Sequence, residues 1–241
     1  MRRWPRARPP RSASATDGVE LLKRALRALD RLVFPRGATC LGCGDQSGCE
    51  RDWLCDACER ELSANWRGDA PLPCAYPLAG AACAYRYRGP VPGMVRALKY
   101  GSVRVLSEFM AGDMARACTS LHLPEAPLVV PAPMHPRRER RRGYNQAEAL
   151  SLPLARRMGW PHERALRKTR NTPQQARLSR EARVVNLEGS VAVRADVRDR
   201  VILLVDDVYT TGATLHACAV ALDRAGARAV YALVYARAGS R

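Results

Sequence analysis

The chain has 241 residues, 47% of them hydrophobic, which is enough for one full domain with its own core plus a smaller module. Lysine and arginine number 40 against 23 acidic residues, and the formal charge of +17 favours polyanionic partners such as nucleic acid, acidic proteins or phosphorylated metabolites. An arginine- and alanine-rich composition is also what a GC-rich genome produces, so the charge alone does not choose a function. No stretch approaches about 18 uninterrupted apolar residues, so no membrane-spanning helix is expected.

The N-terminal residues 1–15 are basic and proline-rich, and they lack the apolar segment of a secretory signal. We predict a disordered tail there, with a basic arm that touches nucleic acid as the alternative. Residues 16–34 follow with apolar side chains on one helical face, which predicts an amphipathic helix. Nine cysteines without an export signal favour metal ligands and buried thiols over disulfides, and we expect a cytoplasmic protein.

Two CxxC pairs, separated by eleven residues, come next. Such pairs bring four thiolates together in the manner of a tetrahedral structural zinc site, with no open position for catalysis. Redox use of either pair is the competing interpretation, and Cys49 lies between the pairs as an alternative ligand. Helix and zinc-ribbon module together are assigned to residues 16–62. The four expected zinc ligands are Cys40, Cys43, Cys55 and Cys58.

Residues 63–80 form a connection rich in proline, glycine and alanine, and residues 81–241 are assigned to a second, larger domain. In this domain apolar strand-like runs alternate with helical patterns, which predicts an α/β fold with a doubly wound parallel sheet. The expected strands are 82–89, 127–133, 201–205 and 229–236. The expected helices lie within 89–102, at 105–121, after 145 and at 213–225.

The stretch 201–214 contains the main candidate site. Its five apolar residues, 201–205, are typical of a strand buried on both faces of a parallel sheet. Asp206 and Asp207 follow where that strand should end, and a loop of threonines around Gly212 leads into a helix. In doubly wound sheets ligands bind at the carboxyl ends of the strands, with phosphates at the N-terminus of the next helix.

Each residue type in this stretch suits one part of a phosphorylated sugar. Gly212 allows the backbone to approach an anion closely, and the threonine hydroxyls add donors. The carboxylates of Asp206 and Asp207 would repel a phosphate, so sugar hydroxyls, shared with Mg²⁺, are their natural partners. A tight strand-to-helix turn without a ligand is the alternative.

This order of residues resembles the phosphoribosyl-diphosphate (PRPP) motif of type I phosphoribosyltransferases. The resemblance implies that Asp206 and Asp207 are the catalytic carboxylates and hold the ribose 2′- and 3′-hydroxyls. It also implies that the following loop wraps the 5′-phosphate. The loop residues are Tyr209, Thr210, Thr211, Gly212, Ala213 and Thr214.

Further motifs in the same order along the chain resemble the ComF/GntX family, whose members join an N-terminal zinc ribbon to a phosphoribosyltransferase-like domain. These motifs are Lys99-Tyr100, His135, Arg138, residues 142–147, Thr169, Gln174-Gln175, Arg183 and Asn186. The resemblance implies a role in natural competence, in handling imported single-stranded DNA, with a helicase as partner. Where many relatives carry a second cysteine cluster, this chain keeps only Cys74 and Cys83, without knuckle spacing. It also has Tyr209 and Met134 in place of aliphatic residues that are usual in the family.

The basic run 135–142 is the expected place for binding the diphosphate of PRPP, because it follows a predicted strand at 127–133. Arginine is suited to this task because its planar guanidinium binds phosphate bidentately. Resemblance to type I enzymes implies that the run is a mobile hood over the site. A solvated charge run is the alternative, preferred for Arg140 and Arg141, and Asn145 is a candidate helix cap. The expected diphosphate clamp consists of Lys99, Arg137, Arg138 and Arg142.

Three functions are compatible with these features. The first is a PRPP-dependent transfer of a phosphoribosyl group, with Mg²⁺, to an acceptor that the residues do not identify. The second is a non-catalytic adaptor that senses PRPP or a nucleotide. The third is a DNA-handling accessory protein in which the zinc ribbon and a basic surface contact single-stranded DNA without sequence specificity, and this role is compatible with either of the others.

Overall fold

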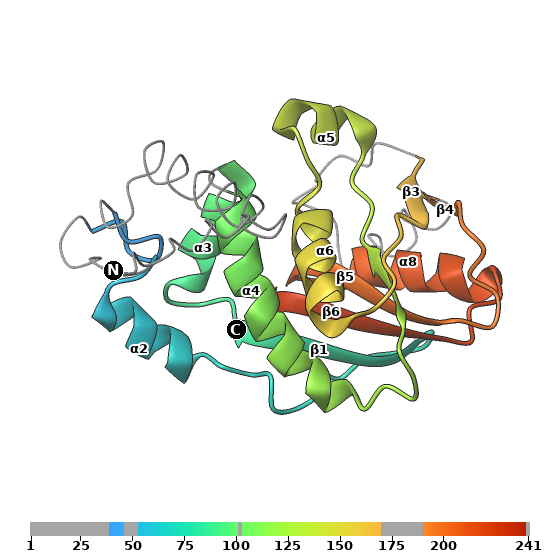
Figure 1. Ribbon diagram of the computed structural model, residues 1–241, viewed down its shortest axis with the longest axis horizontal. Coiled ribbons are helices and arrows are strands. Elements are labelled where there is room, and N and C mark those ends of the chain that lie inside the picture. Colours follow the sequence, from blue (N-terminus) through green and yellow to red (C-terminus); the bar gives the residue numbers. More distant parts are fainter. Residues whose placement is uncertain (1–38, 46–52, 101–102, 170–189, 240–241) are drawn as a thin grey trace, which may run out of the picture.

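The computed structural model describes residues 39–45, 53–100, 103–169 and 190–239 (Figure 1). The predicted basic tail and N-terminal helix lie outside these residues, as do Cys49 and the glutamine and arginine motifs at 174–186.

A four-stranded parallel sheet with the order β1-β6-β5-β2 forms the centre of the fold. All four predicted strands are in it, which confirms the expected parallel sheet. Its strands are β1 (Leu78–Arg86), β2 (Leu128–Pro131), β5 (Val201–Tyr209) and β6 (Ala229–Arg237).

Strand β1 begins earlier than residues 82–89, inside the segment expected to be a linker. The reason is that this segment doubles back along β1: the Leu72 N–H donates to the Ala81 carbonyl at 2.6 Å, and Trp66 forms an antiparallel bridge with Tyr85. The backbone groups at the outer edge of β1 are thereby satisfied by residues of the connection itself. The proposed domain boundary after residue 80 stays a prediction.

Helices cover both faces of the sheet, as a doubly wound fold requires, and Figure 1 shows α4 and α6 on the face opposite α8. The first face is covered by α3 (Val91–Tyr100), α4 (Val103–Cys118) and α6 (Gln146–Met158). The second is covered by α8 (Ala213–Arg224) and by the antiparallel pair β3 (Leu166–Lys168) and β4 (Val191–Val193). The remaining elements are α2 (Asp56–Ala64), η1 (Thr119–Leu121) and α5 (Pro136–Arg142).

Successive side chains of β5 point to opposite faces of the sheet, and both faces are covered, which explains why residues 201–205 are all apolar. Leu203 and Val205 pack into the core under α3, α4 and α6, whereas Ile202 and Leu204 pack into the core under α8. All four are fully buried. A central parallel strand with helices on both sides has no solvent-facing positions, so the apolar run correctly predicted burial on both faces.

The cysteine module shares the core of the larger domain. Cys40 and Cys58 belong to the same apolar cluster as Met94 and Leu98 of α3. The first knuckle also lies close to α3 at Gly93, where the carbonyl oxygens of Leu41 and Gly42 occupy the space of a side chain. The module is therefore packed directly on the helix that carries Lys99.

None of the helices in the described ranges is long and apolar enough to cross a membrane.

The close approach at Gly93 can be tested with a pair of glycine substitutions. Gly93→Ala would place its Cβ 2.6 Å from the Gly42 carbonyl oxygen, so we expect it to lower the free energy of unfolding by about 1–3 kcal/mol. Gly112→Ala in α4 is the control, because its nearest atoms are 3.8 Å away on the Arg157 side chain, and it should be neutral or stabilise by up to about 1 kcal/mol. Urea unfolding of both variants measures the difference, and equal stability would show that the knuckle does not press on α3.

Candidate functional site

A cleft of about 450 Å³ opens at the carboxyl ends of β5 and β2. This is the edge of a parallel sheet where ligands are expected. Its volume falls within the roughly 300–1,000 Å³ typical of small-molecule sites. The cleft is lined by Lys99, Ala132, Pro133, Met134, His135, Arg138, Arg142, Asn145, Gln146, Lys168, Asp206, Asp207, Val208, Thr210 and Thr214.

The two carboxylates lie at the end of the buried run of β5. Asp206 accepts a hydrogen bond from the Asp207 N–H at 2.9 Å, and Asp207 accepts one from the Val208 N–H at 2.8 Å. Burial, and then the negative charge of Asp207, raise the pKa of Asp206 to about 8. Burial in this position therefore disfavours the ionised form of Asp206, and a partner that supplies positive charge or hydroxyl donors would stabilise that form.

Lys99 reaches the acid pair from the last turn of α3. Its Nζ lies 3.2 Å from Oδ2 of Asp207, and both side chains are partly buried. The predicted phosphate-binding lysine is thus in the cleft, paired with one of the two predicted catalytic carboxylates. A ligand with both hydroxyls and phosphates would contact both members of this ion pair.

The basic run contributes two of its three predicted clamp residues to the cleft. All of this run except His135 folds as α5, with His135 as its N-cap and Gly143, whose φ is +90°, as its C-cap. Arg138 and Arg142 are four residues apart, on one face of this helix, and both line the cleft. Arg137 is exposed and does not line it.

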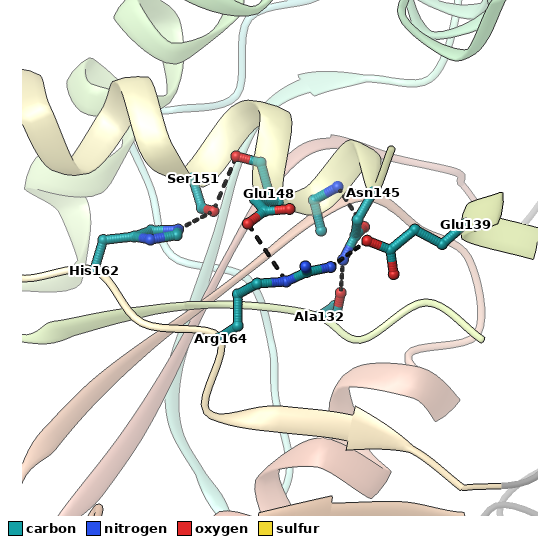
Figure 2. A network of polar contacts seen from close by, with 8 residues as sticks. Ala132, Glu139, Asn145, Glu148, Ser151, His162 and Arg164 are labelled. Carbon is teal, nitrogen blue, oxygen red and sulfur yellow. Dashed lines mark hydrogen bonds and ion pairs between the residues drawn. The ribbon is translucent and has the colours of Figure 1, made fainter. Parts of the chain in front are cut away.

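A network of polar contacts connects α5 and α6 to the chain around them, as Figure 2 shows. Arg164 is paired with Glu139 of α5, and its Nε lies 3.4 Å from Glu148 of α6. The Asn145 side chain accepts from the Ala147 N–H, capping α6 as predicted, and donates to the Ala132 carbonyl at 2.9 Å. These contacts tie the segment between β2 and α6 to both of its neighbours.

The predicted 5′-phosphate loop connects β5 to α8. Gly212 has a φ of +75°, and a side chain there would meet the Tyr209 ring at 2.6 Å, so only glycine fits without strain. Thr210 and Thr214 line the cleft, whereas Tyr209, Thr211 and Ala213 do not. Thr211 accepts a hydrogen bond from the Ala213 N–H at 3.4 Å. The loop therefore presents two hydroxyls and the first turn of α8 to the cleft.

Lys168 and Gln146 are among the cleft residues that were not assigned to ligand binding from the sequence. Lys168 lies on β3, and burial lowers its pKa below the ordinary value. Gln146 is 3% exposed, and its Nε2 lacks a hydrogen-bond partner among the described residues. A buried donor without a partner costs stability unless a ligand or water accepts from it. Gln146 belongs to the motif 142–147, so the family resemblance was the available signal, but nothing in the residues themselves indicated a role in the cleft.

The four predicted metal ligands are brought together. The sulfur atoms of Cys40, Cys43, Cys55 and Cys58 all lie within 4.8 Å of one another, and those of Cys43 and Cys55 are 3.9 Å apart. A Zn–S distance of about 2.3 Å in a tetrahedron requires sulfurs about 3.8 Å apart, so the cluster fits that geometry. The backbone N–H groups of Gly42 and Cys55 point at the Cys40 sulfur at 3.4 and 3.3 Å.

The thiols of the cluster differ in their electrostatics: burial raises the pKa of Cys58 above its ordinary value, whereas that of Cys40 is lowered. Burial acts to raise the pKa of Cys40, but backbone N–H groups around its sulfur outweigh this effect and lower that pKa to about 6. A thiolate is the form that binds metal. Cys74 is exposed and Cys83 lies in the core on the opposite face of the sheet, so neither belongs to the cluster.

Comparison with known proteins identifies relatives among proteins named for DNA use and competence. DNA utilization protein YhgH of Escherichia coli (strain K12) is 35% identical over 154 residues, which cover 60% of this chain and 66% of that protein. The protein of the same name from Salmonella typhimurium (strain LT2) is 38% identical over 119 residues, 48% and 51% of the two chains. Competence protein F of Haemophilus influenzae (strain Rd) is 34% identical over 134 residues, 54% and 58% of the two chains.

No family model matches the chain. Among solved structures, that of TT1426 from Thermus thermophilus is similar over 56% of this chain and 84% of that one, at 18% identity and a TM-score of 0.36. A likeness this weak carries no argument about fold or function.

Fold and cleft together define an α/β protein with a ligand site at the carboxyl edge of a parallel sheet and a four-cysteine metal-type module. The chain belongs to the family of competence protein F and DNA utilization protein YhgH, which confirms the resemblance found in its motifs. It spans between 51% and 66% of the length of the relatives described above. What the whole protein acts on and binds is therefore a matter for proposal.

The raised pKa of Asp206 predicts a pH-dependent effect of Asp206→Asn on stability. Because the folded-state pKa lies above the unfolded value, the contribution of this group to stability is complete below about pH 4 and is lost as pH rises to about 8. Asparagine does not titrate, so the variant does not lose this contribution as the pH rises. Its free energy of unfolding, relative to that of the unaltered protein, should therefore increase over this window by at most about 1.4 kcal/mol per pH unit. Urea unfolding between pH 5 and 8, with exposed Asp69→Asn as control, measures the gain, and a constant difference would contradict it.

Proposed function

We propose that the cleft binds PRPP, or a related phosphorylated sugar or nucleotide, together with Mg²⁺, and that the chain transfers the phosphoribosyl group to an acceptor in the use of imported DNA. The observation that carries this proposal is the combination of groups that line the cleft. Two carboxylates, the hydroxyls of Thr210 and Thr214, and cations that include Lys99, Arg138 and Lys168 surround one space. A molecule that carries both phosphates and sugar hydroxyls matches that combination.

The partnerless donor of Gln146 supports the same kind of ligand. Its Nε2 is buried and Gln146 lines the cleft, so an acceptor oxygen on a bound molecule would satisfy it. Phosphate and ribose oxygens are both suitable acceptors. An apolar ligand would leave this amide unsatisfied.

In the proposed reaction the bond between ribose C1 and diphosphate breaks as a nucleophile attacks C1, through a transition state that resembles an oxocarbenium ion. Asp206 and Asp207 would hold the ribose hydroxyls, and their charge would stabilise positive charge on the sugar. Lys99, Arg138 and Arg142 would stabilise the departing diphosphate. Mg²⁺, when bound, would neutralise part of the diphosphate charge, and the two carboxylates are oxygen ligands of the kind it prefers.

A second candidate is a non-catalytic adaptor that senses PRPP or a nucleotide, or that contacts single-stranded DNA, with a helicase as partner. The net charge of +17 favours this candidate, since a strongly basic protein attracts nucleic acid regardless of the nucleic-acid sequence. The names of the relatives refer to competence and DNA utilization, which fits either candidate and a cytoplasmic location.

Calorimetric titration with PRPP and Mg²⁺ tests the proposed ligand. Asp206→Asn combined with Asp207→Asn should abolish binding, because both groups that hold the ribose diol lose their charge. Asp69→Asn combined with Asp196→Asn removes the same charge from exposed positions outside the cleft and should bind as the unaltered protein does. Equal affinity in all three proteins would refute the site. If PRPP binds, release of diphosphate on addition of nucleophiles separates the transferase from the adaptor.

We infer in addition that the four-cysteine cluster holds a structural zinc ion. Elemental analysis of the purified protein should find one zinc per chain, and Cys40→Ser should lose it. Structural zinc supplies roughly 10–16 kcal/mol to small modules, so this variant should also unfold at lower urea concentration. Cys74→Ser, an exposed cysteine outside the cluster, should keep both metal and stability. A protein without zinc, or zinc content unchanged by Cys40→Ser, would contradict the assignment.

A further inference from the structure

A second concave site lies on the same edge of the sheet, at the carboxyl ends of β1 and β6. It has a volume of about 260 Å³, just below the range of typical small-molecule pockets. Four arginines surround it, and its remaining walls are Tyr87, Leu72, Cys83 and Gly239. The arginines are Arg67, Arg86, Arg88 and Arg237. None of these residues lines the cleft of the acid pair.

The fold brings these like charges together through backbone contacts. Arg86 and Arg237 are register partners on adjacent parallel strands, so their side chains leave the sheet side by side. The Arg67 N–H donates to the Ala84 carbonyl at 2.7 Å, which places Arg67 next to the same strand. The Tyr87 N–H donates to the Arg237 carbonyl at 2.8 Å. The backbone positions of these arginines are thus fixed next to one another, and the exposed side chains of Arg67, Arg86 and Arg88 extend from them.

No carboxylate of the protein relieves this repulsion in the part of the chain that the structure describes. The ion pairs found there involve other cations, namely Lys99, Arg116, Arg164, Arg198 and Arg228. Arg237 has one further contact, over the Tyr209 ring at 5.9 Å from its centroid. Like charges on neighbouring strands are unfavourable, so a cluster of four is most stable when an anion lies among them.

The charges of two of these arginines act on a buried thiol at the floor of the site. Burial raises the pKa of Cys83 to about 11, while the nearby charges of Arg67 and Arg237 act in the opposite direction. Leu72 and Cys83 are buried, so the floor is apolar, and Tyr87, which is half-buried, is also among the lining residues. Guanidinium groups bind phosphate bidentately, and an apolar floor beside them suits an aromatic or apolar group attached to that phosphate.

We propose that Arg67, Arg86, Arg88 and Arg237 form a second anion site, which binds a phosphomonoester carrying an aromatic or apolar group. A nucleoside 5′-monophosphate is the simplest molecule of this class. The site is separate from the proposed PRPP cleft in its residues, and its existence does not depend on that function.

Calorimetric titration with a nucleoside 5′-monophosphate tests this site, using the full chain with Asp206→Asn and Asp207→Asn as the background, so that the proposed nucleotide-binding cleft does not contribute. Arg67→Gln combined with Arg86→Gln should weaken binding at least about tenfold, because two charge-assisted contacts are lost. Arg194→Gln combined with Arg224→Gln is the matched control: it removes the same charge from exposed positions that line neither site and should leave affinity unchanged. Equal affinity in all proteins, or equal weakening in both double variants, would overturn the proposal.

Two further arms identify the ligand and keep the test separate from the proposed function. Inorganic phosphate should bind more weakly than the nucleotide, and Tyr87→Leu should remove that difference; if phosphate binds as tightly as the nucleotide, the aromatic part of the proposal is wrong. The Arg67/Arg86 double variant should retain the PRPP affinity of the unaltered protein, since the cleft is intact. If it does not fold, the single variant Arg67→Gln, in the exposed connection, serves in its place with an expected loss of several-fold.

Discussion

The two carboxylates at the end of β5 are the constraint around which the rest of the structure is arranged. A strand buried on both faces delivers Asp206 and Asp207 to an edge where the first is desolvated and each repels the other. Two adjacent acids in such a place need cations or donors, and the fold supplies them from three directions: Lys99 from α3, Arg138 and Arg142 from α5, and Lys168 from β3. The ion pair between Lys99 and Asp207 provides part of this compensation within the protein, and the rest is available to a ligand.

This dependence gives the cysteine module a role in the site although it lies away from the cleft. The first knuckle packs against α3 near its start, and Lys99 lies in the last turn of the same helix. Cys40 and Cys58 share an apolar cluster with Met94 and Leu98. The position of α3 therefore depends on whether the cysteine module is folded. A helix transmits such a displacement along its length because its backbone hydrogen bonds keep it rigid. A metal that orders the knuckles would thereby also fix the lysine beside Asp207.

The site residues that are consecutive in the chain could be predicted from the sequence. Those that the fold brings together from distant segments could not. The buried strand, the acid pair and the threonine loop are consecutive, so their arrangement follows from the order of residues 201–214. The arginines of the basic run were predicted to bind phosphate because of their side-chain chemistry. Which of them line the cleft depends on the helical structure of α5, which places Arg138 and Arg142 there but not Arg137. Lys168 was not predicted because it reaches the site through the pairing of β3 with β4, which are far apart in the sequence.

The carboxyl edge of this sheet combines two different electrostatic environments. Around β5 and β2 both acids and cations line the cleft, which suits a molecule with both hydroxyls and phosphates. Around β1 and β6 the described lining residues offer cations and an apolar floor without a carboxylate, which suits a phosphomonoester that carries an apolar group. Tyr209 stands between them, packed against Gly212 of the loop on one side and under Arg237 on the other. One side chain of β5 therefore lies against the loop of the first site and near an arginine of the second.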